Sequence, residues 1–498
     1  MPRGPNFHRM GIEDGAVVDT LFAVGSYDPT WVDAQLAEVV RLGYNTIRTS
    51  VDLCRHHCIG STGGGLDAKF LDNVADLIGR ARSHGLQVLL NSNDLPSDGG
   101  YVPRVEGTFG ADFDGYMNSQ YLSPVGFEVY RNYWLEIVRG LVDRHVALDA
   151  VAGYQLRGEA FFFSDKPPLS RRSGMVTTAN GKTYDLSDAT ARRAMLDEGL
   201  RFWLDSIRAA IRAVDPTALV GVGAFAPNDP NPWRPEGDTR FVLMEPIWAS
   251  TLDFVDVHAY PGYIPFDSLA ADLRLGRGDQ GKPVILGEYG AFRFAFSTPA
   301  AGAAGLMAWQ VASCPYGIDG WMHWHWQGTN DQEVWTGTDG ENAINRVLSP
   351  VERPDPCATA NLPYLETNLA MGRPVSVSGA TAGSPGALAV DGVASTGWES
   401  GAGPPGTIEV QLDGASTIRE VRLTVNQYPA GQTVHRLLLR VQGQWQVVNT
   451  FSGQTEIGQV LTWTPTQPVA GVTAIRVETV VSPSFVAWYE IEVLGSKA

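Results

Sequence analysis

Apolar side chains follow a helical spacing and a strand-like spacing in turn along residues 3–350. The helical segments, in which apolar positions recur every three or four residues, are 28–42, 66–84, 127–145, 192–213 and 300–312. The intervening apolar runs, short enough to be buried strands, are 3–7, 44–48, 86–90, 151–159, 219–223, 254–258, 284–286 and 320–326. This alternation predicts an α/β fold with a parallel sheet, closed into a (β/α)8 TIM barrel over residues 1–350.

The pattern changes near residue 350. Pro350, Pro354 and Pro356 mark residues 351–365 as a linker. Beyond it the helical spacing is lost, and short alternating segments take over at 407–412, 420–425, 434–441, 474–478 and 489–493. Turn residues separate these segments at regular intervals, which predicts a β-sandwich over residues 366–498.

Net charge and hydropathy narrow the class of partner. The formal net charge of −17 and the pI near 4.9 oppose binding to nucleic acid, which requires a basic face. No run of about 18 apolar residues occurs, so we expect no insertion into a membrane. The hydrophobic content of 44% suits a large core, and the acidic charge suits a soluble protein with a neutral substrate.

Cys54, Cys58, Cys314 and Cys357 are the four cysteines of the chain. Four cysteines permit three pairings, which the sequence does not resolve. The segment 54–58 (Cys-Arg-His-His-Cys) raises zinc as an alternative, but no second pair of ligands follows at a matching spacing. We therefore predict no metal site there, and a loop disulfide or free thiols instead.

Glu159 and Glu288 each end an apolar run and are followed at once by aromatic residues. In a (β/α)8 barrel, residues at the carboxyl ends of the strands form the active site. Two carboxyl groups brought there from different strands are what a retaining glycosidase requires, one as proton donor and one as nucleophile. The alternative for either residue alone is a strand-end carboxylate that faces solvent.

Further polar residues stand at the ends of other predicted strands. Arg48 ends the second strand, where a guanidinium can hold a nucleophilic carboxylate charged and aligned. Asn91 and Asn93 lie at the end of the third strand and offer amides that bind hydroxyl groups, with loop capping as the alternative. His258 and Tyr260, at the end of the sixth strand, are predicted to bind a substrate hydroxyl and the nucleophile, respectively.

Trp324 and Trp326 share one face of the predicted eighth strand, opposite to His323 and His325. An inward Trp324 would form the floor beneath a sugar ring, and both tryptophans are candidate substrate-binding residues. Packing in the core is the alternative, which we expect for at least one of them.

The aromatic run Phe161–Phe163 predicts different environments for the two carboxyl groups. Desolvation beside this run is expected to raise the pKa of Glu159 and keep it protonated. Arg48 and Tyr260 are expected to keep Glu288 ionised. These environments assign Glu159 as acid/base and Glu288 as nucleophile, in a reaction that needs no cofactor.

Taken in order, these residues resemble the clan of (β/α)8 retaining glycosidases that includes the cellulases and mannanases of glycoside hydrolase family 5. The similarity covers residues 3–350 and rests on matching positions at Arg3, Asn6, Arg48, Glu159, His258, Tyr260, Trp324 and the segment 285–288 (Ile-Leu-Gly-Glu). It implies hydrolysis of a β-linked poly- or oligosaccharide by double displacement, with the same roles for Glu159 and Glu288. It also implies a secreted protein, and no leader opens this chain.

Two positions depart from the family pattern. The family has Asn before the strand-four Glu, where it binds the sugar 2-hydroxyl, and this chain has Gly158. The family commonly ends strand three with His, where this chain has Asn-Ser-Asn at 91–93. Hydrogen bonds to the 2-hydroxyl supply several kcal/mol in the transition state. Their loss leaves three alternatives: a different substrate, weak activity, or a non-catalytic carbohydrate-binding or adhesion protein with a degenerate barrel.

Residues 366–498 resemble the discoidin or coagulation-factor C-type domain, a jelly roll that is also used as a carbohydrate-binding module. The matching segments are 368–375, 389–392, 395–400, 427–435 and 488–495. The resemblance implies a sugar-binding domain, which in such modules often holds a structural calcium ion, and it identifies no sugar-contacting residues.

Overall fold

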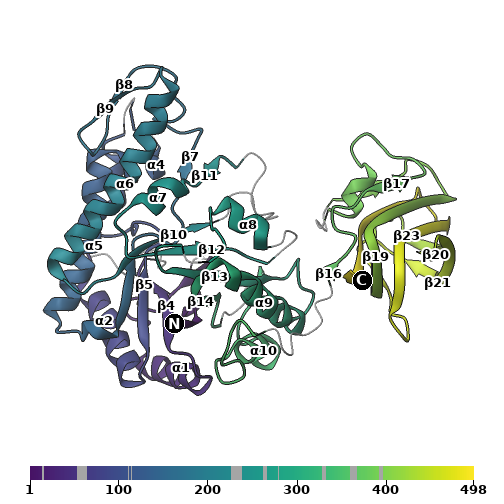
Figure 1. The fold of residues 1–498 in the computed structure, drawn as a ribbon, viewed down its shortest axis with the longest axis horizontal. Helices are drawn as coiled ribbons and strands as arrows, with labels where there is room; N and C mark the ends of the chain where they lie inside the picture. The colour runs from purple at the N-terminus through teal and green to yellow at the C-terminus, as the bar shows by residue number, and fades with distance from the viewer. Residues whose placement is uncertain are drawn as a thin grey trace. The chain divides into compact units, whose positions relative to one another are not determined.

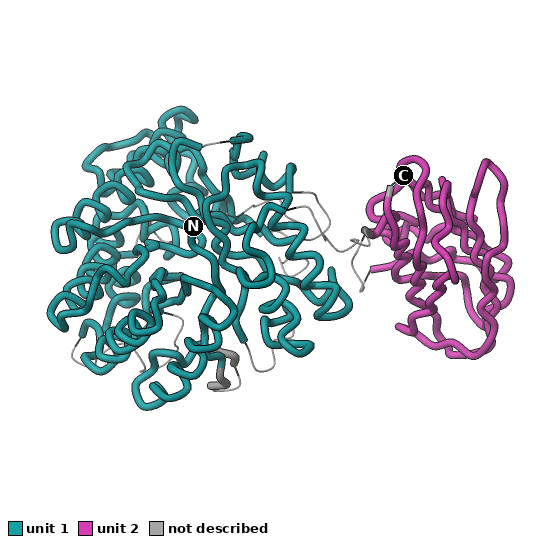
Figure 2. The backbone as a smooth tube through the Cα atoms, turned by 60° about the horizontal axis from the view of Figure 1, so that its bottom comes forward, with its two compact units in different colours: residues 1–360 teal, residues 361–498 magenta. Residues whose placement is uncertain are grey.

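The computed structural model describes residues 1–13, 16–52, 64–109, 112–113, 115–225, 238–261, 266–278, 280–327, 333–358, 367–391 and 396–497. The chain divides into two compact units, residues 1–360 and 361–498 (Figure 2). Within the described residues no helix is long and apolar enough to span a membrane.

Parallel strands form the barrel of the first unit. They are β1 (Arg3–Pro5), β4 (Thr46–Ser50), β5 (Gln87–Asn91), β6 (Val151–Gln155), β10 (Val220–Phe225), β12 (Phe254–His258), β13 (Val284–Phe292) and β14 (Ile318–Trp324). They pair in the order β1-β14-β13-β12-β10-β6-β5-β4. A parallel bridge between Asn6 and Arg48 closes the ring, with the Phe7 N–H donating to the Arg48 carbonyl at 2.7 Å. Eight parallel strands thus form a nearly closed barrel, consistent with the predicted fold.

Helices pack around the barrel strands (Figure 1). The longest are α1 (Pro29–Arg41), α2 (Ala68–Ser83), α5 (Pro124–Asp143), α6 (Ala189–Val214) and α9 (Pro299–Ser313). Each matches a segment predicted from apolar spacing, because a helix buries one face against the barrel. Side-chain caps that accept hydrogen bonds from the first turn set where they begin, at Asp28, Asp67, Ser123, Asp188 and Thr298.

Short elements complete the first unit, and their patterns are too brief to reveal a period. The helices are α3 (Tyr101–Glu106), α4 (Tyr116–Leu122), α7 (Met244–Ala249), α8 (Phe266–Asp272) and α10 (Asp339–Val347). The strands are β2 (Met10–Glu13), β3 (Ala16–Asp19), β7 (Phe162–Phe163), β8 (Met175–Thr177), β9 (Thr183–Asp185), β11 (Arg240–Phe241) and β15 (Val334–Trp335). The antiparallel pairing of β7 with β11 matters for the site, because it brings Arg240 beside the segment that follows Glu159.

The second unit is built from antiparallel strands, paired in the order β16-β24-β19-β23-β20-β21 with β17, β18 and β22 at the side. They are β16 (Thr367–Asn368), β17 (Val375–Val377), β18 (Trp398–Glu399), β19 (Gly406–Val425), β20 (Gly431–Val441), β21 (Gln444–Thr455), β22 (Val460–Trp463), β23 (Val469–Val481) and β24 (Ala487–Lys497). Alternate residues of these strands build an apolar core around Trp398 and Trp488. The β-rich character is as predicted, and the finer discoidin-like assignment stays a prediction.

Residues 351–358, which fall in the predicted linker, are fastened to the barrel. The Arg3 guanidinium donates to the carbonyl of Arg353 at 2.6 Å and to that of Pro354 at 3.2 Å. The Val351 N–H donates to the Leu42 carbonyl at 3.3 Å. The chain therefore stays on the barrel beyond the first of the linker prolines.

A disulfide joins Cys314, next to the end of α9, to Cys357. The Cα atoms of the two residues are 5.9 Å apart. This bond selects one of the pairings that the sequence leaves open. Cys54 and Cys58, on which the zinc alternative depends, lie outside the described residues.

Candidate active site

The inside of the barrel changes from apolar to polar along the strands. Near the amino ends, Leu89, Phe254 and Ile285 pack together as a small apolar cluster. The next inward layer is polar and fully buried, and we call its five residues the polar layer: Asn6, Arg48, Asn91, Gln155 and Asp256. Side chains of a strand alternate between its faces, so Asn91 and Asp256 point inward like the apolar residues two positions before them.

Arg48 is the centre of the polar layer. Its guanidinium donates to Glu288 Oε1 at 2.8 Å, to Gln155 Oε1 at 2.9 Å and to Asn6 Oδ1. Its Nε lies 3.5 Å from Asp256 Oδ2. A planar guanidinium with several donors is suited to hold a carboxylate in one orientation. The arrangement therefore fixes the Glu288 carboxylate from below.

Glu288 lies within β13, and its side chain is 9% exposed. The Tyr260 hydroxyl donates to Glu288 Oε2 at 3.0 Å. Burial, followed by the charges of Glu288 and Glu159, raises the pKa of the Tyr260 phenol well above its ordinary value, so the hydroxyl remains a donor. Both oxygens of Glu288 are thus held, one by Arg48 and the other by Tyr260.

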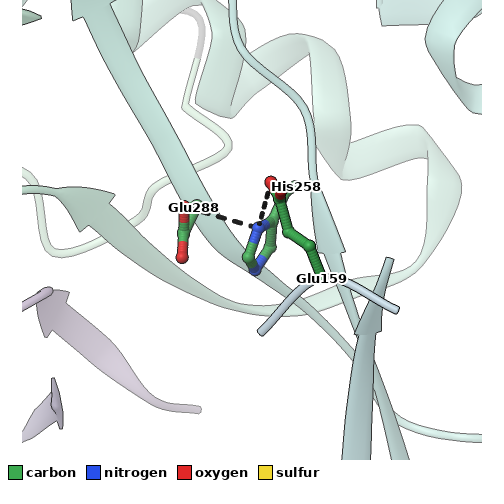
Figure 3. Close-up of side chains that lie close together, drawn as sticks. All are labelled: Glu159, His258 and Glu288. Carbon is green, nitrogen blue, oxygen red and sulfur yellow. Dashed lines mark hydrogen bonds and ion pairs between the residues drawn. The ribbon is translucent and has the colours of Figure 1, made fainter. Parts of the chain in front are cut away.

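Glu159 reaches the same space from the loop after β6. The strand ends at Gln155, so Glu159 lies beyond the strand rather than at its last residue as predicted. Its side chain is 36% exposed, against 9% for Glu288. One carboxylate oxygen of each Glu and a ring nitrogen of His258 all lie within 4.8 Å of one another (Figure 3). The two carboxyl groups, distant in the chain, therefore meet at the mouth of the barrel.

His258 contacts both carboxylates (Figure 3). Its Nδ1 lies 3.1 Å from Glu159 Oε1 and 3.4 Å from Glu288 Oε2, and its Nε2 lies 3.4 Å from Asp256 Oδ2. Burial lowers the pKa of His258, but the charges of Glu288 and Asp256 and the hydrogen bonds to Asp256 and Glu159 outweigh burial and raise the pKa to about 10. His258 is therefore an imidazolium near neutral pH.

The predicted rise in the pKa of Glu159 is wrong. Burial does raise this pKa, but the hydrogen bond and charge of His258, with the charges of Arg240 and Arg48, outweigh burial and leave the pKa below its ordinary value. Phe161, which we expected to desolvate Glu159, instead packs against the Arg240 guanidinium, 5.5 Å from the centre of its ring. The error arises because Arg240 comes from β11, whose pairing with β7 is not visible in the local pattern.

Asn91 and Asn93 flank the position of Gly158. A Cβ atom added at Gly158 would lie 2.1 Å from Asn93 Oδ1 and 3.2 Å from Asn91 Nδ2. The Asn93 carboxamide thus fills the space that a side chain at 158 would take. Neither amide atom of the buried Asn91 has a hydrogen-bond partner among the described residues. Amides are therefore available beside the segment that carries Glu159, although residue 158 supplies none.

Trp324 and Trp326 lie in different environments. Trp324 is partly exposed, and its ring centre is 5.0 Å from that of His8. Trp326 is 1% exposed, and its indole N–H donates to Gln35 Oε1 of α1 at 2.9 Å. Trp326 therefore packs between the barrel and α1, as the core alternative expects for one of the two residues, and this environment does not favour its predicted role in substrate binding.

The site also holds polar residues that are not among the predicted ones, notably Asp256, Gln155 and His8. Alternation along β12 could have revealed Asp256, because it lies two positions before His258 and shares its face. His8 is buried, and its Nδ1 lies 2.6 Å from Asp19 Oδ2. No local signal marks His8, because its partner comes from the neighbouring strand β3.

Glu159, His258 and Glu288 form the one group of described residues whose ligand atoms are close enough to hold a metal ion. The Arg48 guanidinium donates to Glu288 Oε1 at 2.8 Å and so occupies one oxygen of this carboxylate. A metal ligand must be a neutral imidazole, whereas the raised pKa of His258 favours the imidazolium when no ion is bound. That the site holds no metal stays a prediction. The calcium ion offered for the second unit stays a prediction.

No protein-family model and no curated protein matches this chain. Among solved structures, an exo-β-1,4-mannosidase from Opitutaceae bacterium strain TAV5 is similar over 72% of this chain and 60% of that chain, with 16% sequence identity and a TM-score of 0.46. The family 32 carbohydrate-binding module of NanJ from Clostridium perfringens, in complex with galactose, is similar over 26% of this chain and 98% of that chain (18% identity, TM-score 0.24). Chitosan-binding module 1 of a chitosanase/glucanase from Paenibacillus sp. IK-5 is similar over 26% of this chain and 99% of that chain (26% identity, TM-score 0.23).

Proposed function

We propose that the protein is a retaining β-glycoside hydrolase that cleaves O-glycosidic bonds of a β-linked poly- or oligosaccharide. The observation that carries this proposal is the convergence of Glu159 and Glu288, with carboxylate oxygens within 4.8 Å of each other. Carboxyl groups of retaining enzymes lie about 5–5.5 Å apart, whereas inverting enzymes need about 6.5–9.5 Å to admit a water molecule. The spacing therefore favours double displacement.

The environments of the two residues favour distinct roles. Glu288 is the more buried, and Arg48 and Tyr260 hold both of its oxygens, as a nucleophile aimed at the anomeric carbon requires. Glu159 is the more exposed and lies where a departing sugar and an incoming water molecule have access. We assign Glu159 as acid/base and Glu288 as nucleophile, with His258, Asn93 and Trp324 as contacts for the sugar.

The second unit and the disulfide extend the proposal. We propose that residues 361–498 bind carbohydrate and bring the barrel to its substrate. The Cys314–Cys357 disulfide suits an oxidising compartment, which agrees with a secreted protein acting on an extracellular glycan.

A non-catalytic carbohydrate-binding protein is the second candidate. The low pKa of Glu159 favours it, because an ionised carboxylate has no proton for the leaving group. Gly158, in place of an amide, favours it too. The two candidates differ in whether any glycoside is turned over.

The test uses 4-nitrophenyl β-glycosides of glucose, mannose, galactose and xylose. We expect the wild type to hydrolyse at least one, and Glu288→Gln to abolish that turnover. Glu159→Ala should lose about 10²- to 10⁴-fold in rate on a substrate that needs acid catalysis, and azide should restore part of the rate. Glu128→Gln, at a carboxylate whose side chain is 52% exposed, is the control and should match the wild type. Binding of sugars without turnover would support the second candidate instead.

A further inference from the structure

We propose that Asp256 and His258 form a proton relay that supplies Glu159 from inside the barrel. This inference rests on the proposed hydrolase function and names a positioning residue, Asp256, that the reaction itself does not touch. The relay supplies a proton that Glu159 needs for its proposed role, because the lowered pKa of Glu159 leaves this carboxyl ionised in the free site.

Asp256 is a fully buried carboxylate held in one orientation. Its Oδ1 accepts the Gly287 N–H at 2.7 Å, and its Oδ2 faces His258 Nε2 at 3.4 Å and Arg48 Nε at 3.5 Å. A buried charge is strongly unfavourable unless other charges compensate it. Arg48 also donates to Glu288 at the shorter distance of 2.8 Å, so its charge is shared between two carboxylates. His258 is therefore needed as a second cation for Asp256.

The charged groups around His258 come from several elements of the barrel, whereas β10, which pairs with β12 at Phe225 and His258, supplies none there. Glu288 lies on β13, Arg48 on β4, Asp256 on β12 itself, and Glu159 on the loop after β6. The Arg48 guanidinium is 3.4 Å from His258 Nε2, and the Asp256 carboxylate lies beside both groups. Without Asp256, the protonated form of His258 would lose the carboxylate that faces its Nε2.

The orientation of the His258 ring directs its Nδ1 proton to Glu159. With Nε2–H facing Asp256, Nδ1–H points to Glu159 Oε1 at 3.1 Å and to Glu288 Oε2 at 3.4 Å. Glu288 already accepts from Arg48 and Tyr260. For the Glu159 carboxylate, His258 is the hydrogen-bond donor among the described residues. The shorter contact therefore leads to the group that must be protonated.

In the first half of the reaction, the Nδ1 proton passes to Glu159, and Glu159 passes a proton to the glycosidic oxygen as its bond to the anomeric carbon breaks. Glu288 forms its bond to that carbon, and His258 is left neutral, with its remaining proton on Nε2. In the second half, a water oxygen bonds to the anomeric carbon as the bond to Glu288 breaks. Glu159 takes the proton of that water, and the proton returns to Nδ1, so that all groups recover their starting state.

The test compares two glycosides of the sugar that the wild type accepts. A 2,4-dinitrophenyl glycoside has a leaving group that needs no proton, whereas a methyl glycoside depends on the acid. Asp256→Asn keeps the size and the acceptor for Gly287 N–H. We expect it to lower kcat/KM for the methyl glycoside about 10- to 100-fold, and to leave the dinitrophenyl glycoside nearly unchanged. The alkaline limb of the methyl-glycoside pH profile should move to lower pH.

Asp215→Asn is the matched control, since Asp215 is also a buried carboxylate but precedes β10 at the amino end of the barrel. It should leave both substrates unchanged. Equal slowing of both substrates by Asp256→Asn would mean that Asp256 only supports the fold, and would overturn the relay.

A direct measurement covers the case in which Asp256→Asn does not fold. Nitrogen-15 NMR of labelled histidine, with His258 identified from its absence in His258→Asn, reports the ring protonation of the wild type. A ring protonated above neutral pH supports the relay, and a neutral ring at neutral pH overturns it. If the wild type hydrolyses no glycoside, the proposed function fails, and this result is distinct from either outcome at His258.

Discussion

The polar layer of the barrel and the apolar core of the second unit bury side chains of different character. The core of the second unit consists of Val, Leu, Ile, Ala and Trp side chains. The polar layer of the barrel buries a guanidinium and a carboxylate, Arg48 and Asp256, without exposed surface. Desolvation of a buried ion pair can exceed what its attraction returns, so stability alone gives little reason to keep one. The contrast indicates that the polar layer is retained for chemistry, whereas the second unit is packed for stability.

Removing the central cation should produce the largest effect. Arg48→Met leaves Glu288 and Asp256 as buried carboxylates without their guanidinium, which we expect to cost about 3–5 kcal/mol in the free energy of unfolding of the barrel. Arg476→Met in the second unit removes a cation paired with Glu409 at 2.8 Å, but both side chains remain partly exposed, and we expect a loss below about 1 kcal/mol.

Urea unfolding and calorimetry, both performed on Arg48→Met and Arg476→Met, measure the two losses in stability. Circular dichroism before unfolding checks that each variant is folded at the start. Equal losses of unfolding free energy in Arg48→Met and Arg476→Met would show that the polar layer depends on its cation no more than a partly exposed ion pair does. The contrast between the two interiors would then not hold.

Acid should weaken both units through one buried histidine in each. Burial lowers the pKa of His323 in the barrel and of His435 in the second unit from 6.5 to about 4. A histidine with a depressed pKa stabilises the fold above its unfolded pKa, and this contribution is lost as the pH falls from about 6.5 to about 4, with a size of about 3 kcal/mol for each residue. Thermal unfolding measured across this window should show both transitions falling.

Alkali should separate the units. The pKa of His258 is raised from 6.5 to about 10, so its stabilising contribution is full below 6.5 and is lost as the pH rises through about 10. The barrel transition should therefore fall toward high pH beyond any change in the second unit. His258→Gln should remove this additional alkaline loss, and His435→Gln should remove the acid loss of the second unit alone. An unchanged alkaline slope in His258→Gln would contradict the assignment.

The parts of the molecule that follow from sequence are those with a local period. Apolar spacing predicts α1, α2, α5, α6 and α9 and the strands of the barrel, because burial on one face leaves its mark within a few residues. The strand-end rule then places Glu159 and Glu288 at one mouth. The protonation state of Glu159 does not follow from the sequence, because its pKa depends on His258 and Arg240, which approach it from other strands.

Trp326 shows the same limit in another form. Alternation assigns Trp324 and Trp326 to one face, but Trp326 lies two residues beyond the end of β14 and is no longer bound by the alternation of that strand. Its indole N–H reaches α1 instead. A hydrophobic period holds only within the helix or strand that produces it, so predictions from pattern fail for residues just beyond a strand. These are also the positions where (β/α)8 barrels form their active sites.

Gly158 offers the smallest and most specific test. Asn93 Oδ1 occupies the space of a side chain at 158, so Gly158→Asn must displace it, at a cost of about 1 kcal/mol because only the end of one side chain has to move. If the Asn93 amide binds a sugar hydroxyl, Asn93→Ala should lower kcat/KM several-fold, in keeping with one hydrogen bond of about 1 kcal/mol. Gly158→Asn combined with Asn93→Ala should restore both stability and rate, because the new amide enters the vacated space. Unchanged kinetics in Asn93→Ala, with no gain from the double variant on any glycoside, would show that neither position contacts the sugar and that Asn93 only fills the gap left by the glycine.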